Sequence, residues 1–267
     1  TRAMEMIAAS KMRRAQEQAR SSRPYTDKMV QVLADLATRP PEDVVHPLLE
    51  SREVKTVELI HISTDRGLCG GLNGNLNRQT AAFIVEKAVP VRVVTVGRKG
   101  REFIVRCGCH LAAEFSGLGD RPSLLDTTPI SRIVIDDYTN RQVDVVYLAY
   151  SQFVTTMVQR PVLKQLLPIH PAGVSGGQGV EYIYEPSSSF VLFELLPRFV
   201  ELQVYHAILE SIASEQSARM VAMRHATENA EEYIEDLTLS YNKVRQEMIT
   251  KELLDLIGGA AQISKAR

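Results

Sequence analysis

The chain has 267 residues, 45% hydrophobic and 24% charged, with a formal net charge of -1 at pH 7. This composition predicts a folded protein of one large domain or two modest ones, and it argues against nucleic acid as the main partner, because nucleic-acid-binding domains usually carry a basic excess. Three cysteines, Cys69, Cys107 and Cys109, are too few for a disulfide framework and favour a reducing compartment. No apolar run is long enough to span a membrane. Since the first residue is Thr1 and not Met, we expect that the true N-terminus is missing.

The first predicted element is a long helix over residues 1–39. Its residues are good helix formers, and Pro24 is its only helix breaker. A proline removes a backbone donor and crowds the preceding turn, so we expect a bend near Pro24. Small or flexible side chains recur along one side of this helix and would let another helix approach closely: Met4, Ala8, Met12, Ala15 and Ala19.

The middle of the chain alternates short β-branched runs with helical ones. Residues 57–63, 91–96, 144–150 and 181–185 are predicted strands, and residues 72–88 and roughly 123–141 are predicted helices. This alternation is typical of an α/β sheet domain. We therefore divide the chain into an N-terminal helix with its connector (1–53), an α/β domain (54–186) and a C-terminal long helix (187–267).

The C-terminal part carries the strongest periodic signal. Residues 198–257 contain neither Gly nor Pro, which predicts one helix about 90 Å long. Steps of three and four residues trace a mostly apolar seam, and a period of 3.5 predicts a coiled coil whose partner is the N-terminal helix. The seam consists of Leu202, Tyr205, Leu209, Ile212, Gln216, Arg219, Met223, Ala226, Ala230, Tyr233, Leu237, Ser240 and Val244.

Gln216 and Arg219 interrupt this seam with polar groups. A polar residue in an apolar seam costs stability, so it usually fixes the register of the helices or faces a different partner. The sequence leaves both interpretations open for these two residues.

A glycine-rich stretch, "STDRGLCGGLNGN" (residues 63–75), lies between a predicted strand and a predicted helix. This is where α/β proteins bind anions, because a helix N-terminus offers unpaired N–H groups. However, no Lys follows the glycines, and their spacing does not match G-x-G-x-x-G. The stretch is therefore more typical of a plain strand-to-helix turn than of a phosphate site.

Three other motifs are weak candidates for chemistry. "GVSGG" resembles the nucleophile elbow of hydrolases around Ser175, but it precedes a predicted strand where the elbow requires a helix. "CGCH" (residues 107–110) offers three metal ligands without the second motif that a zinc site needs. The basic residues near the N-terminus are interleaved with Glu and suit a solvated face or an acidic protein surface better than nucleic acid: Lys11, Arg13, Arg14, Arg20 and Arg23. We predict no catalytic residue and no metal site.

Four motifs together resemble the gamma subunit of the F-type ATP synthase. They are "TRAMEMIAASKMRRAQ", "STDRGLCGGLN", "ASEQSARMVAMRHATENA" and "LSYNKVRQEMITKELLDLIGGA", in the same order along essentially the whole chain. The resemblance implies an antiparallel coiled coil of the two terminal helices with an inserted Rossmann-like α/β sheet domain. It also implies a non-catalytic rotor that transmits torque between a proton-driven c ring and a catalytic hexamer, in a complex on the cytoplasmic face of the bacterial plasma membrane.

The resemblance further implies partners and contact residues. The partners are alpha, beta and epsilon subunits and the c-subunit ring, with nucleotides bound by the hexamer, so no cofactor and no direct nucleotide binding is expected. The family pattern assigns contacts with beta subunits to Met4, Cys69, Arg219, Gln246, Thr250, Glu252 and Asp255. It assigns contacts with the c ring to Tyr182, Tyr184 and Glu185. Cys107 and Cys109 do not lie in an inserted regulatory segment, so thiol regulation is not expected.

Two rival hypotheses belong to other functional classes. A free-standing α/β enzyme would use the glycine loop or Ser175, and its activity would be lost on Ser175→Ala. A coiled-coil scaffold unrelated to ATP synthesis would be indifferent to changes at Gln246 and Thr250.

Overall fold

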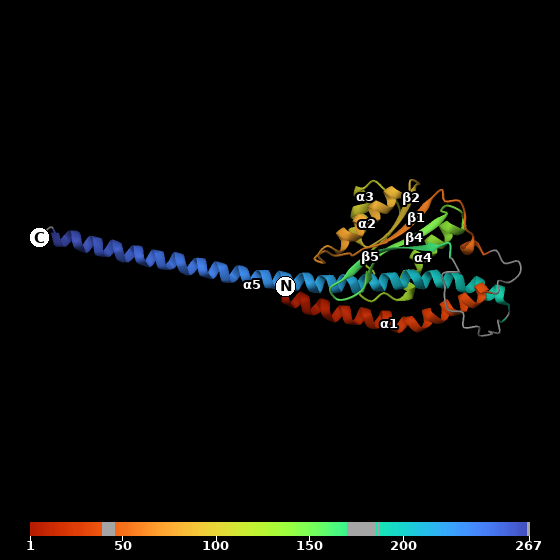
Figure 1. The fold of residues 1–267 in the computed structure, drawn as a ribbon, viewed down its shortest axis with the longest axis horizontal. Coiled ribbons are helices and arrows are strands. Elements are labelled where there is room, and N and C mark those ends of the chain that lie inside the picture. Colours follow the sequence, from red (N-terminus) through yellow and green to blue (C-terminus); the bar gives the residue numbers. More distant parts are fainter. Residues whose placement is uncertain (39–45, 170–184, 186, 266–267) are drawn as a thin grey trace. The chain divides into compact units, whose positions relative to one another are not determined.

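The computed structural model describes residues 1–38, 46–169, 185 and 187–265. Its helices are α1 (Arg2–Thr38), η1 (Pro47–Leu49), α2 (Leu72–Glu86), α3 (Arg98–Arg106), α4 (Leu124–Thr139) and α5 (Ser188–Lys265), labelled in Figure 1. Its strands are β1 (Val57–Ile62), β2 (Val91–Val96), β3 (His110–Phe115), β4 (Val145–Phe153) and β5 (Gln159–Leu167). The chain divides into two compact units, one of Ala3–Ala222 and one of Thr1–Arg2 with Met223–Arg267.

The five strands form one sheet in the order β3-β2-β1-β4-β5. β1 pairs in parallel with β2 and with β4, β2 pairs in parallel with β3, and only the edge strand β5 is antiparallel to its neighbour. This is a doubly wound, Rossmann-like arrangement, in which the strand order reverses between β1 and β4. The predicted α/β domain is therefore confirmed.

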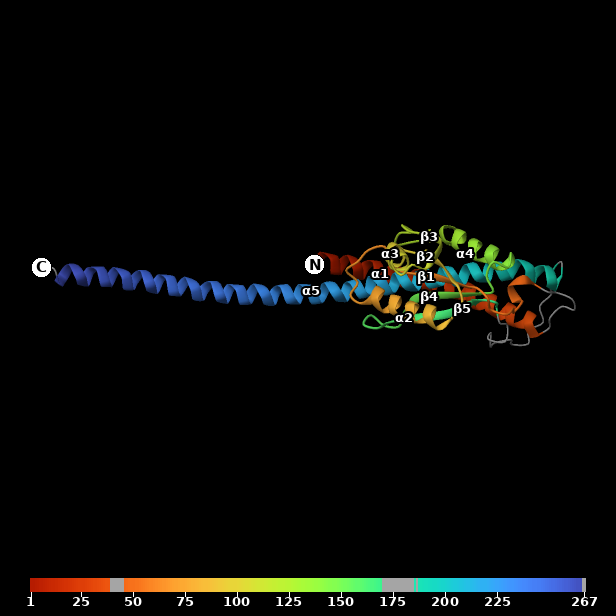
Figure 2. The same ribbon diagram turned by 90° about the horizontal axis from the view of Figure 1, so that it is seen from above.

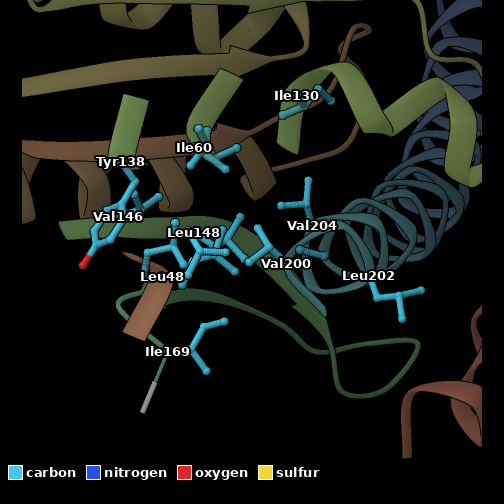
Figure 3. Close-up of a cluster of buried hydrophobic side chains, with 14 of the residues drawn as sticks. Leu48, Ile60, Ile130, Tyr138, Val146, Leu148, Ile169, Val200, Leu202 and Val204 are labelled. Carbon is cyan, nitrogen blue, oxygen red and sulfur yellow. The ribbon is translucent and has the colours of Figure 1, made fainter. Parts of the chain in front are cut away.

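Helices cover both faces of the sheet, and the strand period of two decides which residue meets which face. Leu59 and Val93 lie in one apolar cluster with Leu76 of α2 and Ile104 of α3. On the other face, Ile60, Val146 and Leu148 lie in a cluster with Ile130 of α4 and Val200 and Val204 of α5, as Figure 3 shows. Because both faces are covered, every residue of the central strand β1 is buried, the polar residues Glu58 and His61 included.

Helix α1 runs beside the first part of α5 in the opposite direction, as both ribbon views show (Figure 2). Ala8 and Ala15, on the predicted narrow side of α1, are each only 1% exposed. The side-chain amide of Gln18 donates to the hydroxyl of Tyr205 on α5, at 2.9 Å. The predicted antiparallel pairing is thus confirmed for this part of α5, and α1 continues through Pro24 as one helix.

Several elements differ from the sequence-based expectation. α5 extends beyond the breaker-free run 198–257 and begins at Ser188, close to the predicted start at residue 187. It continues through Pro197 because Leu192, Leu196 and Val200 are buried on either side of the proline and tertiary packing outweighs its cost. β5 was missed because it contains Pro161, which is tolerated on an edge strand. α3 and β3 were missed as well, α3 being short with an internal Gly100. The predicted strand 181–185 lies almost wholly outside the described residues.

The second compact unit is helical over Met223–Lys265, within α5. The side chain of Thr227 donates to that of Thr1 at 2.7 Å. Large apolar side chains in this part of α5 are exposed, among them Tyr233, Ile234, Leu237, Tyr241, Met248 and Leu253. In the described part of the chain, no helix combines the length and the apolar character that a membrane span requires.

Candidate functional site

A cavity of about 670 Å³ lies at the carboxyl edge of the parallel strands, and we call it the sheet-edge cavity. Ligands of doubly wound folds bind at this edge. Its walls come from the loops after β1, β2 and β3 and from helices α1 and α5. Residues that line it include Met4 and Lys11 of α1, Asp65–Leu68, Gly97 and Arg98, Gly117 and Asp120, and Glu215, Gln216 and Arg219 of α5.

The loop that follows β1, residues 63–71, is the glycine loop predicted from the sequence. Thr64 and Asn73 hold its base, because the Asn73 amide donates to the Thr64 hydroxyl at 2.7 Å and its oxygen accepts from the Thr64 N–H at 3.3 Å. Leu68 and Gly70 have φ values of 63° and 58°, in the left-handed region. Gly70 adopts this conformation without a side-chain penalty. The outcome is a sharp reversal whose tip, Arg66–Leu68, is exposed.

Crowding does not explain the glycines of this loop. A Cβ atom at Gly67 or Gly70 would meet nothing within 4 Å. Close approach of the backbone occurs instead after β2, where a Cβ at Gly97 would overlap the backbone oxygen of Ser63 and one at Gly100 would overlap the His61 ring. The contact of this loop with a beta subunit through Cys69 stays a prediction.

Asp65 binds the start of α3. Its carboxylate accepts from the backbone N–H of Arg98, the first residue of α3, at 3.0 Å and from that of Gly117 at 2.8 Å. An anion at a helix N-terminus satisfies free N–H groups and is favoured by the helix dipole. The chain thus supplies its own anion to α3, whereas α2, the helix that follows the glycine loop, begins at Leu72 without a side-chain cap.

Cys69 lies beneath the exposed tip of the glycine loop and is 3% exposed. Its sulfur accepts a hydrogen bond from the Asn73 amide at 3.4 Å. Burial raises the pKa of the thiol, the nearby carboxylate of Glu215 acts in the same direction, and the guanidinium of Arg219 opposes it. The thiol is therefore close in space to charged groups of α5.

Arg219 forms a network that the sequence did not predict. Its Nη2 pairs with Oε1 of Glu215 at 2.6 Å and donates to the Gly67 carbonyl at 3.2 Å, while Nη1 donates to Oε1 of Gln216 at 3.1 Å. Gln216 in turn donates to Asp120 at 3.2 Å, and Asp120 pairs with Lys11 at 2.7 Å. These contacts join α5 to the glycine loop, to the loop after β3 and to α1.

The network bears on the two polar interruptions of the seam. Gln216 is 3% exposed and bonded within the chain, as the register interpretation expects. Arg219 is also engaged within the chain, so its predicted contact with a beta subunit stays untested. Sequence reasoning missed Asp120 and Asp65, because their partners are distant in sequence. It also missed Glu215, although the spacing of four residues between Glu215 and Arg219 on one helix is a signal that could have found the pair.

Three of the predicted beta-facing residues lie together in the compact unit Ala3–Ala222, and the other four belong to the second compact unit. Met4 and Arg219 line the sheet-edge cavity, and Cys69 lies under the adjoining loop. The other four are exposed on α5 in the second compact unit: Gln246, Thr250, Glu252 and Asp255. Of the predicted c-ring residues, Glu185 is exposed, whereas Tyr182 and Tyr184 lie outside the described residues.

The remaining candidate motifs gain no support. Ser175 lies outside the described residues. Cys107 is exposed and Cys109 is partly exposed, and within the described ranges no three His, Cys, Asp or Glu side chains are grouped as metal ligands. Lys11 of the basic N-terminal cluster is paired with Asp120.

Comparisons with known proteins agree with the fold and the motifs. A family model described as ATP synthase matches residues 1–263. An ATP synthase gamma chain of Dehalococcoides mccartyi (strain 195) is 60% identical over 265 residues, which cover 99% of this chain and 93% of the relative. An ATP synthase gamma chain of Roseiflexus sp. (strain RS-1) is 51% identical over 269 residues, with the same coverage of 99% and 93%.

Solved structures share the fold at lower identity. A chain of the central stalk and c ring of Tetrahymena thermophila mitochondrial ATP synthase has a TM-score of 0.65 at 23% identity, covering 85% of this chain and 98% of that one. A chain of Euglena gracilis mitochondrial ATP synthase in rotational state 3 has a TM-score of 0.60 at 17% identity, covering 98% of this chain and 95% of that one. Sequence identity and shared architecture together place the chain in the family of ATP synthase gamma chains.

Proposed function

We propose that this chain is the central rotor of an F-type ATP synthase and transmits torque between a c-subunit ring and a hexamer of alpha and beta subunits. The observation that carries the proposal is the 60% identity with an ATP synthase gamma chain over 99% of this chain. The chain takes no part in bond making itself; the active sites lie on the beta subunits. The complex lies on the cytoplasmic face of a bacterial plasma membrane, with the chain as a peripheral subunit and epsilon bound beside it.

An asymmetric shaft explains how such a rotor acts. One shaft presents a different side to each of three beta subunits, and each beta conformation is favoured only by its differential contact free energy with that side. Rotation therefore exchanges the three conformations among the beta subunits. By reciprocity, ATP hydrolysis at the beta subunits drives the shaft in the opposite direction.

Two surfaces of the chain suit contact with the hexamer. The first is the tip of the glycine loop with Met4, where Met4 is 50% exposed and Leu68 is 63% exposed. Since Cys69 is buried under this tip, Arg66 and Leu68 would meet a beta subunit before Cys69 does. The second is the exposed stretch of α5 that carries Gln246, Thr250, Glu252 and Asp255. Its apolar side chains suit rotation within an apolar sleeve that forms few directional bonds.

Contact with the c ring involves a third set of residues. We assign it to Tyr182, Tyr184 and Glu185, of which Glu185 is exposed. An exposed carboxylate can meet polar loops without a large desolvation cost.

The proposal is tested by reconstitution. The purified full chain is mixed with alpha and beta subunits, and we expect a stable complex whose ATPase activity exceeds that of alpha and beta alone. Failure to co-purify, together with failure to stimulate the ATPase, would overturn the rotor assignment. Turnover of ATP by the chain alone, lost on Ser175→Ala, would instead favour the free-standing enzyme.

A second arm separates the rotor from a plain scaffold. Gln246→Ala and Thr250→Ala are expected to lower the stimulated ATPase, because the family pattern places both side chains against beta. The matched control is Asn242→Ala, another exposed polar residue on the same helix. An ATPase that is indifferent to all three changes would favour the scaffold.

A further inference from the structure

We propose that Arg219 acts as a latch that fixes the glycine loop to α5, and that Glu215 is the positioning residue that holds the Arg219 guanidinium in place. The inference assigns to Arg219 a role inside the chain, distinct from a direct contact with a beta subunit. Its mechanical consequence rests on the proposed rotor function, whereas the latch itself is a property of this chain.

The geometry of the pair supports a fixed guanidinium. Glu215 and Arg219 lie one turn apart on α5, and their side chains are only 16% and 15% exposed. Nη2 of Arg219 contacts Glu215 at 2.6 Å and the Gly67 carbonyl at 3.2 Å, so one nitrogen joins the carboxylate and the loop. The planar fork of Arg leaves Nη1 free to donate to Gln216 at 3.1 Å. Three acceptors in three directions leave the guanidinium little rotational freedom.

The loop tip has little other support of its own. The base of the loop is held by Asn73 through Thr64 and by the amides that bind Asp65. Beyond this base, a Cβ at Gly67 or Gly70 would meet nothing within 4 Å, and Leu68 is 63% exposed. A charged donor on the Gly67 carbonyl is therefore well placed to decide the position of the tip, since a hydrogen bond to a charged group is stronger than a neutral one.

Beyond Arg219, the network of hydrogen bonds and ion pairs continues to α1. Gln216 is 3% exposed and connects through Asp120 to Lys11 of α1. A force applied to the exposed tip would thus be transmitted through the Gly67 carbonyl and Arg219 to helices α5 and α1. Without the contact between Arg219 and the Gly67 carbonyl, the same force would displace the loop without displacing the helices.

The reactivity of the Cys69 thiol measures how often the loop opens, and therefore tests the latch. It lies next to the tip and is buried, so its thiol reacts with a soluble reagent only when the loop opens. With Cys107 and Cys109 replaced by Ser, Cys69 is the only cysteine of the chain. The experiment measures the rate at which the full-length Cys107→Ser/Cys109→Ser chain reacts with a disulfide reagent such as dithionitrobenzoate.

Two variants separate loop opening from a change in local charge. Glu215 raises the pKa of the Cys69 thiol and Arg219 lowers it, so a purely electrostatic effect would accelerate the reaction in Glu215→Gln and slow it in Arg219→Gln. The latch predicts acceleration in both, by about tenfold in Arg219→Gln, because the lost bonds to a charged group are of that strength. Unchanged or slower reaction of Arg219→Gln would overturn the proposal.

A control variant excludes a general loss of structure. Arg132→Gln removes an exposed arginine from α4, outside the network that joins α5 to the loop. It is expected to change the Cys69 rate by less than about twofold, since surface substitutions away from such contacts have small effects. Urea unfolding of each variant checks the global stability, and Arg219→Lys, which keeps a charge but loses the fork, serves if Arg219→Gln does not fold. Equal acceleration in Arg132→Gln would overturn the latch.

The same chains test the mechanical consequence. In the reconstituted complex, we expect Glu215→Gln to lower the stimulated ATPase in proportion to the acceleration at Cys69. If the unmodified chain fails to stimulate the alpha and beta subunits, the proposed function falls and the thiol result stands. If Arg219→Gln stimulates normally and leaves Cys69 protected, the latch falls and the proposed function stands.

Discussion

The two stretches of α5 carry the same kind of apolar period but differ in how they are buried. In the compact unit Ala3–Ala222, seam residues such as Leu202 and Leu209 are 5% and 0% exposed. In the unit that contains Met223–Arg267, seam residues such as Tyr233 and Leu237 are each 69% exposed. A heptad-like period therefore indicates that a helix has a partner surface, but it does not indicate whether that partner belongs to the same chain.

The largest expected effect contrasts these two stretches directly. Leu209→Ala removes a side chain that is 0% exposed and leaves a cavity, so we expect a loss of about 2–5 kcal/mol in the free energy of unfolding. Leu237→Ala removes one that is 69% exposed and should cost less than about 0.5 kcal/mol. Urea denaturation of the isolated chain measures both. Similar losses at the two positions would break the comparison.

A second contrast lies inside the first compact unit, at its two glycine-bearing loops. Gly97→Ala places a Cβ against the Ser63 carbonyl at a residue with φ of 99°, so we expect a destabilisation of about 3 kcal/mol. Gly67→Ala meets open space and should change stability by less than about 1 kcal/mol. The thermal midpoints of the two variants test the order. A larger effect at Gly67 would mean that the exposed loop is packed more tightly than its surroundings indicate.

The stability of the chain is expected to depend on pH through Glu58 on β1. This residue is 0% exposed, and its carboxylate oxygens have no hydrogen-bond partner among the described residues. Burial, with the negative charge of Asp137, raises its pKa from 4.5 to about 8. The folded state thus holds a proton that the unfolded state releases, so stability decreases as pH rises from about 4.5 through about 8.

Glu58→Gln removes this dependence. Relative to the unmodified chain, we expect it to gain about 4 kcal/mol of unfolding free energy between pH 5 and pH 9, with the gain at the alkaline end. Urea denaturation at both pH values measures the difference. Asp136→Asn, an exchange at an exposed residue of helix α4, is the control that should show no such change. Equal behaviour of the two variants would remove Glu58 as the cause.

The smallest effect on the unfolding free energy is expected for Thr250→Ala, a change that should instead affect the stimulated ATPase. Thr250 is exposed and its hydroxyl donates to the Gln246 carbonyl at 2.9 Å, one turn back on the same helix. Thr250→Ala should change the unfolding free energy by less than about 0.5 kcal/mol, because this bond is local and solvated. In the reconstituted complex it should lower the stimulated ATPase. A stability loss as large as that of Leu209→Ala would assign Thr250 to the core instead of to a partner surface.

The elements with strong periodic signals were predictable from the sequence. Parallel strands β1 and β2 and the interior of α5 follow from their apolar periods. The course of α5 through Pro197 and the strand β5 do not follow from local propensity, because proline is a breaker in isolation. Pro197 is tolerated through core packing and Pro161 through its position on an edge strand.

The candidate site was predictable only in part. The sequence indicated that Arg219 and Gln216 needed polar partners, and the resemblance grouped Arg219 with Met4 and Cys69. It could not identify Gly67 or Asp120 as the partners, because they become neighbours only when three loops meet at one edge of the folded sheet. Contacts of this kind depend on topology rather than on local propensity.

The carboxylate of Asp65 at the start of α3 has a consequence for the rigidity of the sheet edge. It belongs to the loop after β1 and accepts from Arg98, after β2, at 3.0 Å and from Gly117, after β3, at 2.8 Å. One side chain therefore cross-links three loops that are far apart in the sequence. Groups of the chain itself thus hold together the edge on which α1 and α5 lie.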